Sequence, residues 1–447
     1  MYDKISSAMN MDLWATLDNQ QAKQDQASEA GELAKQGQTR RLTEAAVLSM
    51  VRAWLLRDYL APYCRSLASI RIFRRCYWID GLGVEKRARV TESLVEAGRG
   101  LAEASRPIAL RGLVLKAGSS RRRQGTAGKE AVVKLPESGG LVDASWQEAQ
   151  AALLLAIEQA PAVFLLNPFG QTLFGYDDLA PLYQRTGPTE LFLLLSHKHL
   201  GSHLLAASEP GAANGAALTN LLRSDRWKSL LANPHTATNN ADEHSRGNNT
   251  SGLLRGGQSE IAPPSPLLPT QAIDGLIDLL MASMKARFLT VQRIALPVQV
   301  GAAAIELAPC TLLFATRRQD SLAIMNDAVC AYRRRVSAQS YQGVLGEEWF
   351  AQQERERLAA EQQELEQFVS AQGMAQRPRR WPELRQRLLL TRFGRWPLQE
   401  YDAVMCRLLQ NGVARCEWRR KLTTDSTDEK PVPGDEDILF WIGSKRE

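Results

Sequence analysis

The sequence predicts an α/β fold with a parallel β-sheet, and two strand-like segments lead to this prediction. The first, residues 74–83, is an apolar run that ends in Asp80 and two closely spaced glycines. The second, residues 162–170, has the same form: an apolar run, then the polar Asn167, then a turn. Strands alternate with helix-like segments at spacings typical of right-handed crossovers. We therefore expect Asp80 and Asn167 to border one crevice at the carboxyl edge of the sheet.

Glycine at positions 81 and 83 allows unusual backbone angles and lets a ligand approach the main chain. A strand followed by Asp-Gly is also typical of an ordinary tight turn, so the first segment alone leaves both interpretations open. The second segment favours the ligand-binding interpretation, because two strands of the same form would then deliver polar ends to one place.

Composition places the chain among ordinary globular proteins. Its 447 residues suggest two domains with linkers, and 44% are hydrophobic and 23% charged. No stretch has the apolar length of a membrane span, and the first residues lack the layout of an export signal, so we expect a cytoplasmic protein without membrane contact. The six cysteines are scattered and contain no Cys-x-x-Cys, which indicates neither a zinc site nor a disulfide framework.

Shifts in composition divide the chain into segments. Residues 1–42 contain few large apolar groups and are expected to be a disordered tail. The α/β domain is predicted over residues 43–340, with a flexible surface insertion over 206–268 and a short helix at 221–231 inside it. A helical connector over 341–375 would lead to a separate C-terminal module.

Periodicity assigns the elements of the α/β domain. Helices are expected at residues 43–63, 85–104, 145–159, 177–185, 272–284 and 321–334. Strands are expected at 131–135, 189–195, 288–298 and 312–316, and the segment 107–115 fits either a helix end or a strand. Ser145 with Glu148 three residues later is the pattern of a helix capping box.

The C-terminal module, residues 376–447, shows the order helix, helix, strand, loop, strand, which is that of a winged helix. Arg415, Arg419, Arg420 and Lys421 lie where a wing could touch phosphates. The net charge of +6 is compatible with DNA or RNA as a partner but does not by itself indicate one.

Three histidines, His197, His199 and His203, follow an apolar strand. A metal site needs converging imidazoles and a further ligand, and the nearest acid, Glu190, comes too early. We favour a plain polar loop without metal, and a metal-dependent hydrolase stays as an alternative.

A family resemblance rests on short motifs in a shared order. They are Tyr59-Leu60-Ala61-Pro62-Tyr63, Tyr77-Trp78-Ile79-Asp80-Gly81-Leu82-Gly83, Ser105-Arg106-Pro107-Ile108-Ala109-Leu110, Leu165-Leu166-Asn167-Pro168-Phe169-Gly170, Thr189-Glu190-Leu191 and Phe314-Ala315-Thr316-Arg317. In these motifs the chain resembles the three-Cys-motif partner protein family, from about residue 44 to 440.

The resemblance implies a Rossmann-like, class I methyltransferase-like domain followed by a winged helix. It implies S-adenosylmethionine as cofactor, at Asp80, Gly81 and Gly83. It also implies that the strand end Asn167-Pro168-Phe169 grips a target amine, and that a three-Cys-motif protein is the partner.

The sequence departs from that pattern at three places. Val84, Glu85 and Lys86 replace the rest of the glycine loop, and Lys116 stands where an acid would bind the ribose. Asn167 replaces an acid and cannot act as a base. We therefore expect a methyltransferase-like protein with a degenerate cofactor site that acts with a partner on or near nucleic acid; the alternative is a non-catalytic nucleic-acid-binding adaptor. Whether the chain is an enzyme stays open.

Overall fold

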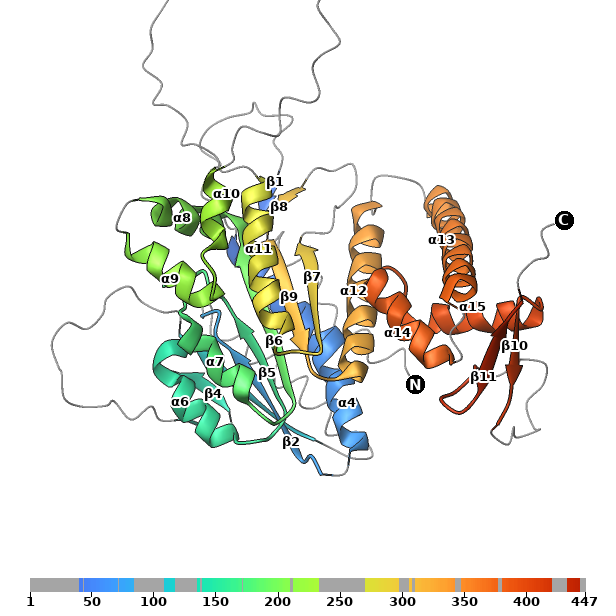
Figure 1. Ribbon diagram of the computed structural model, residues 1–447, viewed down its shortest axis with the longest axis horizontal. Coiled ribbons are helices and arrows are strands. Elements are labelled where there is room, and N and C mark those ends of the chain that lie inside the picture. The colour runs from blue at the N-terminus through green and yellow to red at the C-terminus, as the bar shows by residue number, and fades with distance from the viewer. Residues whose placement is uncertain are drawn as a thin grey trace, which may run out of the picture.

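A seven-stranded sheet forms the centre of the part of the chain that the computed structural model describes (Figure 1). The described residues are 40–42, 44–70, 72–83, 108–116, 135–136, 139–170, 172–209, 212–232, 270–296, 305–307, 310–341, 347–376, 380–419 and 432–442. In spatial order the strands are β4 (Gly140–Val142), β3 (Ala109–Leu115), β2 (Arg75–Asp80), β5 (Ala162–Leu166), β6 (Thr189–Ser196), β9 (Cys310–Thr316) and β7 (Thr290–Leu296). The α/β fold is thus as predicted.

The sheet is mostly parallel. Strands β4, β3, β2, β5 and β6 run parallel to one another, whereas β9 runs antiparallel to both β6 and β7. The parallel sheet expected from the alternating strands and helices is confirmed for β4, β3, β2, β5 and β6, and no direction had been predicted for the late strands β7 and β9. An apolar run carries no information on strand direction, and no helix joins β7 to β9 in the described residues, which favours antiparallel pairing.

The two strands that carry the predicted site are neighbours. Asp80 of β2 pairs with Leu165 of β5, and the Gly81 amide donates a hydrogen bond to the Leu165 carbonyl at 2.8 Å. The carboxyl ends of β2 and β5 therefore lie side by side at one edge of the sheet, which confirms the placement predicted for Asp80 and Asn167. All five residues of β5 are buried, as a central parallel strand requires.

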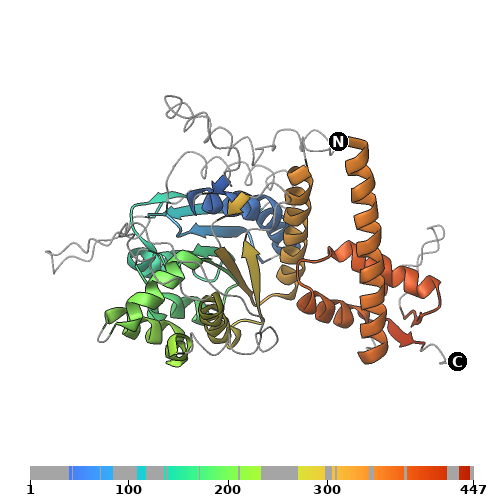
Figure 2. The same cartoon turned by 90° about the horizontal axis from the view of Figure 1, so that it is seen from above.

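One face of the sheet is covered by helices whose apolar side chains share a core with the strands. These helices are α6 (Trp146–Ile157), α7 (Tyr176–Gln184), α8 (His197–Ser208), α9 (Ala213–Leu222) and α11 (Thr270–Lys285). Figure 2 shows the sheet between this layer and the blue helices of the other face. The predicted capping box of α6 is present, since the Glu148 carboxylate accepts a hydrogen bond from the Ser145 amide at 2.8 Å.

The opposite face is covered by a continuous helical stretch near the N-terminus and by α12 (Gln319–Tyr341). The stretch comprises α3 (Glu44–Trp54), the π-helix η1 (Leu55–Leu60) and α4 (Ala61–Ser69). Pro62 lies in the first turn of α4; because α4 continues directly from η1, the missing amide removes one hydrogen bond of the stretch, at its junction with the π-helix. The whole stretch carries Arg52 near one end of the strands and Tyr59 and Tyr63 near the other.

Residues 213–232 differ from the expected surface insertion. They form α9, the 3-10 helix η2 (Arg226–Lys228) and α10 (Ser229–Ala232), and they bury Leu218, Leu221 and Trp227 in the main core. The Gly, Ala and Asn residues around these positions hide the helical spacing of the leucines. Residues 233–268 of the predicted insertion lie outside the described residues.

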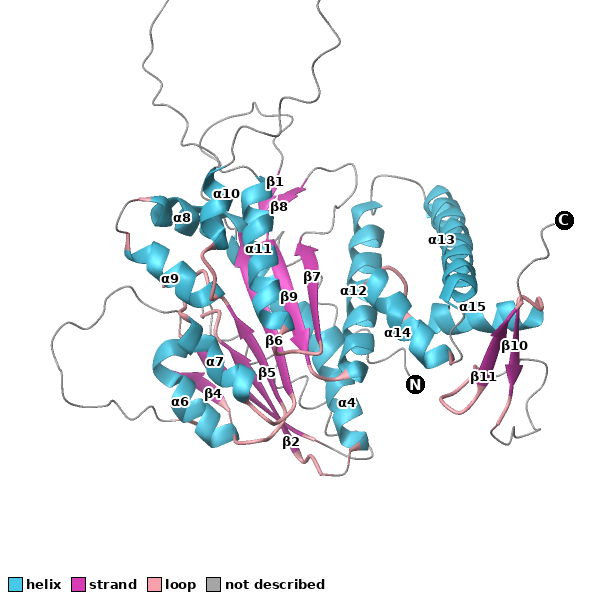
Figure 3. Ribbon diagram, in the orientation of Figure 1, coloured by secondary structure: helices cyan, strands magenta, loops and turns pink. Residues whose placement is uncertain are grey.

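The C-terminal module lies beyond α12 (Figure 3). It contains α13 (Glu347–Gln376), α14 (Trp381–Thr391), α15 (Leu398–Gln410) and the antiparallel strands β10 (Ala414–Glu417) and β11 (Ile438–Trp441). The order of elements after residue 380 is the predicted one. However, α13 is more than a connector, because Leu365 and Val369 are buried in the core of the module.

A buried asparagine on α12 fixes the module to the α/β domain. The Asn326 amide nitrogen donates to the Trp396 carbonyl at 2.8 Å, and its oxygen accepts from the Gly394 amide at 2.8 Å. The neighbouring Asp327 carboxylate accepts from the first amide of α15, that of Leu398, at 2.8 Å. Because Asn326 is fully buried, these bonds replace water contacts and hold the two units in one orientation.

Some expectations fall outside the described residues: the helix at 85–104, most of the strand at 131–135 and residues 1–39 of the tail. Residues 40–42 form strand β1 (Arg40–Leu42), which pairs in parallel with β8 (Ile305–Leu307). In the described ranges, no helix combines the length and the apolar character that crossing a membrane requires.

Candidate functional site

The carboxylate of Asp80, at the end of β2, is buried and engaged by an arginine. The Arg52 Nε donates to Asp80 Oδ2 at 2.6 Å, and the Arg52 Nη2 donates to Asp80 Oδ1 at 3.1 Å. The Leu82 amide also donates to Oδ1, at 3.0 Å. Asp80 is 0% exposed and Arg52 is 8% exposed. The carboxylate that was predicted to bind a cofactor thus has both oxygens occupied by the protein itself.

The turn after β2 is held closed from both sides. Arg52 Nη2 also donates to the Gly83 carbonyl, and Gly83 has a φ of 84°, a value that favours glycine. A Cβ atom added to Gly81 would meet Leu166 Cδ2 at 2.6 Å and Leu115 Cδ1 at 3.7 Å. Leucine side chains therefore occupy the side of Gly81 on which a larger residue would place its side chain, while Gly81 itself is partly exposed.

The predicted catalytic residues follow β5 in a tight turn. The Asn167 side-chain oxygen accepts a hydrogen bond from the Phe169 amide at 3.1 Å, so the amide group stabilises its own turn. Pro168 and Phe169 are buried, and the Phe169 ring packs near His203 with 6.1 Å between ring centroids. Only Asn167 of the three is partly exposed.

The end of β3 carries a lysine where the resemblance implies an acid. Lys116 follows β3 and forms an ion pair with Asp143, which follows the neighbouring strand β4. The Asp143 carboxylate is 79% exposed, but the adjacent Lys116 ammonium compensates its charge. In the described residues the strand ends therefore do not fit S-adenosylmethionine: the first acid is buried against Arg52, and a lysine replaces the ribose-binding acid.

Comparison with protein-family models, curated proteins and solved structures found no match. The chemistry of the site therefore has to be judged from its own residues.

The three histidines lie on α8, which corrects the expectation of a polar loop. His197 Nε2 lies 2.9 Å from the Thr311 hydroxyl, and His203 Nε2 lies 2.9 Å from the Gly170 carbonyl. Burial lowers the pKa of His197, with a further contribution from Arg293. No group of three or more His, Cys, Asp or Glu side chains suited to a metal occurs among the described residues. No observation thus favours a metal-dependent hydrolase.

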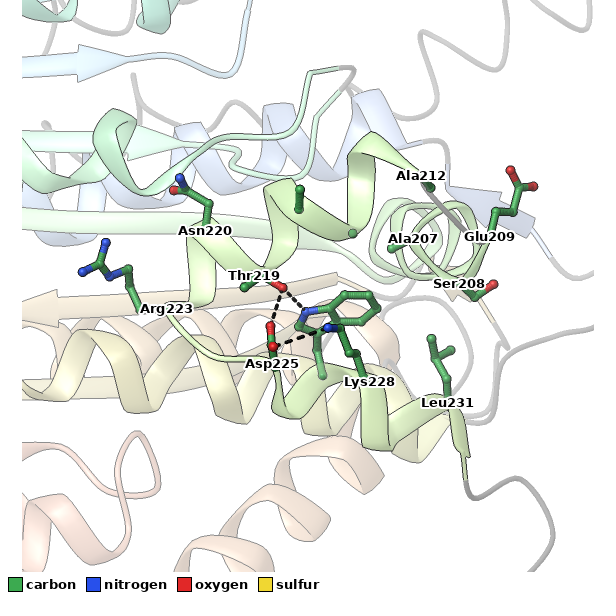
Figure 4. Close-up of a pocket in the computed structure, with 13 residues that line it drawn as sticks. Ala207, Ser208, Glu209, Ala212, Thr219, Asn220, Arg223, Asp225, Lys228 and Leu231 are labelled. Carbon is green, nitrogen blue, oxygen red and sulfur yellow. Dashed lines mark hydrogen bonds and ion pairs between the residues drawn. The ribbon is translucent and has the colours of Figure 1, made fainter.

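A concave surface of about 1060 Å³ lies elsewhere, between α8, α9, η2 and α10 (Figure 4). Its polar groups bind one another: the Thr219 hydroxyl donates to Asp225 at 2.8 Å and accepts from Trp227 Nε1 at 2.9 Å. Lys228 pairs with Asp225 at 3.3 Å. None of the residues predicted for the cofactor or for catalysis lines this surface.

Two of the four residues predicted to bind nucleic acid are described, and both are exposed. Arg415 of β10 lies opposite Phe440 of β11, which is 51% exposed. Arg419 follows β10 and lies 3.6 Å from Glu417. Arg420 and Lys421 lie outside the described residues.

Other arginines at the module are compensated by acids. The ion pairs join Arg334 to Glu400, Arg385 to Asp402, Arg395 to Glu364 and Arg407 to Glu366. The basic character seen in the sequence is therefore weaker on the folded surface than the count of arginines suggests.

Sequence reasoning missed Arg52. Its signal was a lone arginine within a helical stripe of apolar residues that includes Val51 and Leu55, where a charge needs a buried partner. It also gave no role to Glu190, a single acid within the apolar run of β6, which is fully buried. In both cases the signal in the sequence was a single charged residue among apolar residues, which indicates a buried charge.

Proposed function

We propose that this protein is a divergent methyltransferase-like α/β protein that acts by binding a partner and not through S-adenosylmethionine chemistry. The strand order β4-β3-β2-β5-β6 supports the Rossmann-like part of the proposal, because it repeats the 3-2-1-4-5 order of a doubly wound sheet. The helix–helix–strand–strand order after residue 380 supports a winged-helix-like module.

The buried ion pair between Arg52 and Asp80 is the observation that carries the proposal. A cofactor could reach Asp80 only by displacing Arg52, which would leave a guanidinium buried without its partner, at a cost of several kcal/mol. We infer partner binding from the resemblance to the three-Cys-motif partner family, which suggests a three-Cys-motif protein as that partner.

Isothermal titration calorimetry with S-adenosylmethionine and S-adenosylhomocysteine tests the absence of cofactor chemistry. We expect no saturable heat at millimolar cofactor, with an active methyltransferase as the positive control. Saturable binding near one site per chain would overturn the proposal. Sedimentation of the chain with a purified three-Cys-motif protein tests the partner, and a faster-sedimenting complex is expected.

A second candidate, nucleic-acid binding, is favoured by the outer face of the β10–β11 hairpin. Arg415 and the exposed Phe440 are cross-strand neighbours, and Ile442 continues that face at 38% exposure. An aromatic ring beside an arginine can stack a base and contact a phosphate. The acids that pair with other arginines of the module make this candidate the weaker one.

Fluorescence anisotropy with labelled single-stranded RNA and duplex DNA tests this candidate. Binding that weakens steeply with salt, and that is reduced in Arg415→Glu and in Phe440→Ala, would support it. Arg226→Glu, an exposed arginine on η2 far from the hairpin in sequence, is the matched control and should bind as the wild type does. Absent binding at low salt would rule the candidate out.

A further inference from the structure

The corner between α4 and β2 exposes aliphatic side chains. It lies at the amino end of β2, the opposite end of that strand from Asp80 (Figure 1). The Ile70 amide donates to the Leu67 carbonyl at 2.9 Å, which ends α4, and the Phe73 amide donates to the Ile70 carbonyl at 3.2 Å, which closes a tight turn. Ile72 is 77% exposed and Ile70 is 36% exposed. Tight turns favour Gly, Pro, Asn, Asp and Ser, so the turn itself does not explain two exposed isoleucines.

The turn is held at both of its ends. The Phe73 side chain packs against the core that the N-terminal helical stretch forms with the sheet. On the strand side, the Ala109 amide of β3 donates to the Arg74 carbonyl at 3.0 Å. A partner that binds this turn therefore pays little conformational entropy to order it.

Exposed arginines flank the isoleucines. Arg74 and Arg75 follow the turn directly, and Arg65 precedes it on α4. Within the described residues none of these three arginines forms an ion pair with an acid. The Arg75 Nη1 lies 3.5 Å from the Tyr77 hydroxyl, which is a neutral group. The folded chain thus leaves three positive charges at this corner without an acidic partner among the residues that the structure describes.

An acid that contacts this corner, Asp320, is already paired. Its carboxylate accepts a hydrogen bond from the Ser66 hydroxyl of α4, and the Arg318 Nε donates to its Oδ1 at 3.0 Å. Arg318 therefore compensates the charge of Asp320. The α4–β2 patch, as we call this surface, consists of Arg65, Ile70, Ile72, Arg74 and Arg75. It combines apolar side chains with a net positive charge.

The chemistry of the α4–β2 patch favours an acidic protein segment as its occupant. Isoleucine cannot stack on a base as an aromatic side chain does, which argues against single-stranded nucleic acid. Two isoleucine side chains contain fewer carbon atoms than a myristoyl chain, which itself binds a membrane only marginally, and this argues against a lipid surface. Arginine is enriched in protein interfaces, and its planar guanidinium pairs with carboxylates through two hydrogen bonds.

We propose that the α4–β2 patch binds an acidic segment of the protein partner, whose aliphatic side chains pack on Ile70 and Ile72 while its carboxylates pair with the arginines. This inference rests on the proposed partner binding, and it adds the surface and the chemistry of the contact. Because the charges are complementary and exposed, the complex should form more slowly and dissociate more readily as the salt concentration rises.

The test is isothermal titration calorimetry of the full chain with a purified three-Cys-motif protein. We expect Ile72→Ser and Arg74→Glu each to raise the dissociation constant at least about tenfold, and Arg74→Glu also to weaken its salt dependence. Both side chains are exposed, so both variants should unfold at the wild-type temperature. Leu205→Ser, at a 37% exposed leucine of α8, and Arg226→Glu are the matched controls and should bind as the wild type does.

The outcomes separate this inference from the proposed function. If the wild type binds and both patch variants bind equally well, the α4–β2 patch is not the docking surface, although partner binding stands. If the wild type forms no complex, the proposed partner is wrong and this inference fails with it. Vesicles that contain phosphatidylserine are tested alongside. If they bind the wild type but not the patch variants, while the three-Cys-motif protein does not bind, the patch takes a lipid surface and the proposal is overturned.

Discussion

The Arg52 guanidinium and the Asp80 carboxylate form a buried two-point ion pair that joins α3 to the end of β2. We expect Arg52→Met to lower the free energy of unfolding by about 3–5 kcal/mol, because Asp80 is left buried without its partner. Urea unfolding at neutral pH measures this. Glu364→Ala, which removes an ion pair whose side chains are both 46% exposed, should cost no more than about 1 kcal/mol.

The double variant Arg52→Met with Asp80→Leu should recover part of that loss, since neither charge is then left alone. If Arg52→Met unfolds at the same urea concentration as Glu364→Ala, the Arg52–Asp80 ion pair does not stabilise the fold as its burial and geometry indicate.

Gly81→Ala should destabilise the protein by about 1–3 kcal/mol, because the new methyl group meets Leu166 Cδ2 at 2.6 Å in a packed site. Thermal unfolding measures the loss. Combining Gly81→Ala with Leu166→Ala removes that close contact, so the cost of the pair should be smaller than the sum of the two single costs. Additive costs would show that the two positions do not compete for the same space.

Asn326→Ala should separate the unfolding of the C-terminal module from that of the α/β domain. The substitution leaves the Trp396 carbonyl and the Gly394 amide buried without partners, at about 1–3 kcal/mol each. Calorimetry should then resolve two transitions. Asp327→Asn keeps an oxygen that can accept from the Leu398 amide, so it should retain the wild-type profile.

Two glycines inside long helices should respond differently to substitution by alanine. In α13, a Cβ on Gly373 would overlap the Trp441 ring, so Gly373→Ala should displace β11 and lower the stability of the module. In α11, a Cβ on Gly275 would meet the flexible end of Leu230, which can turn aside. There the gain in helix propensity, about 1 kcal/mol, should offset the contact. Chemical denaturation of the two variants side by side measures the difference.

The sheet could be predicted from the sequence because apolar runs and helical stripes extend over whole elements. Such patterns remain recognisable when single residues depart from them. The sequence placed Asp80 and Asn167 at neighbouring strand ends because parallel strands finish at a common edge. The sequence could not predict that β9 runs antiparallel, because an apolar run such as residues 310–316 has the same pattern in either strand direction.

The burial of Asp80 at the candidate site could not be predicted from the sequence, and the reason is a different one. Whether Asp80 is open to a ligand depends on Arg52, a residue 28 positions earlier whose partner is set by tertiary packing. Similarly, Tyr59, Glu190 and Thr316 belong to three motifs that are far apart in the sequence, and only the fold brings them together. Pairing between distant side chains is the information that a single sequence lacks.

The attachment at Asn326 has a geometric consequence for any molecule that touches both halves of the protein. While the two hydrogen bonds of Asn326 hold, the β10–β11 hairpin and the main sheet cannot move independently. The distance from Phe440 to the carboxyl edge of the sheet is therefore fixed. A ligand that spans both would be selected by its length and stiffness, and a flexible or shorter one would reach only a single contact.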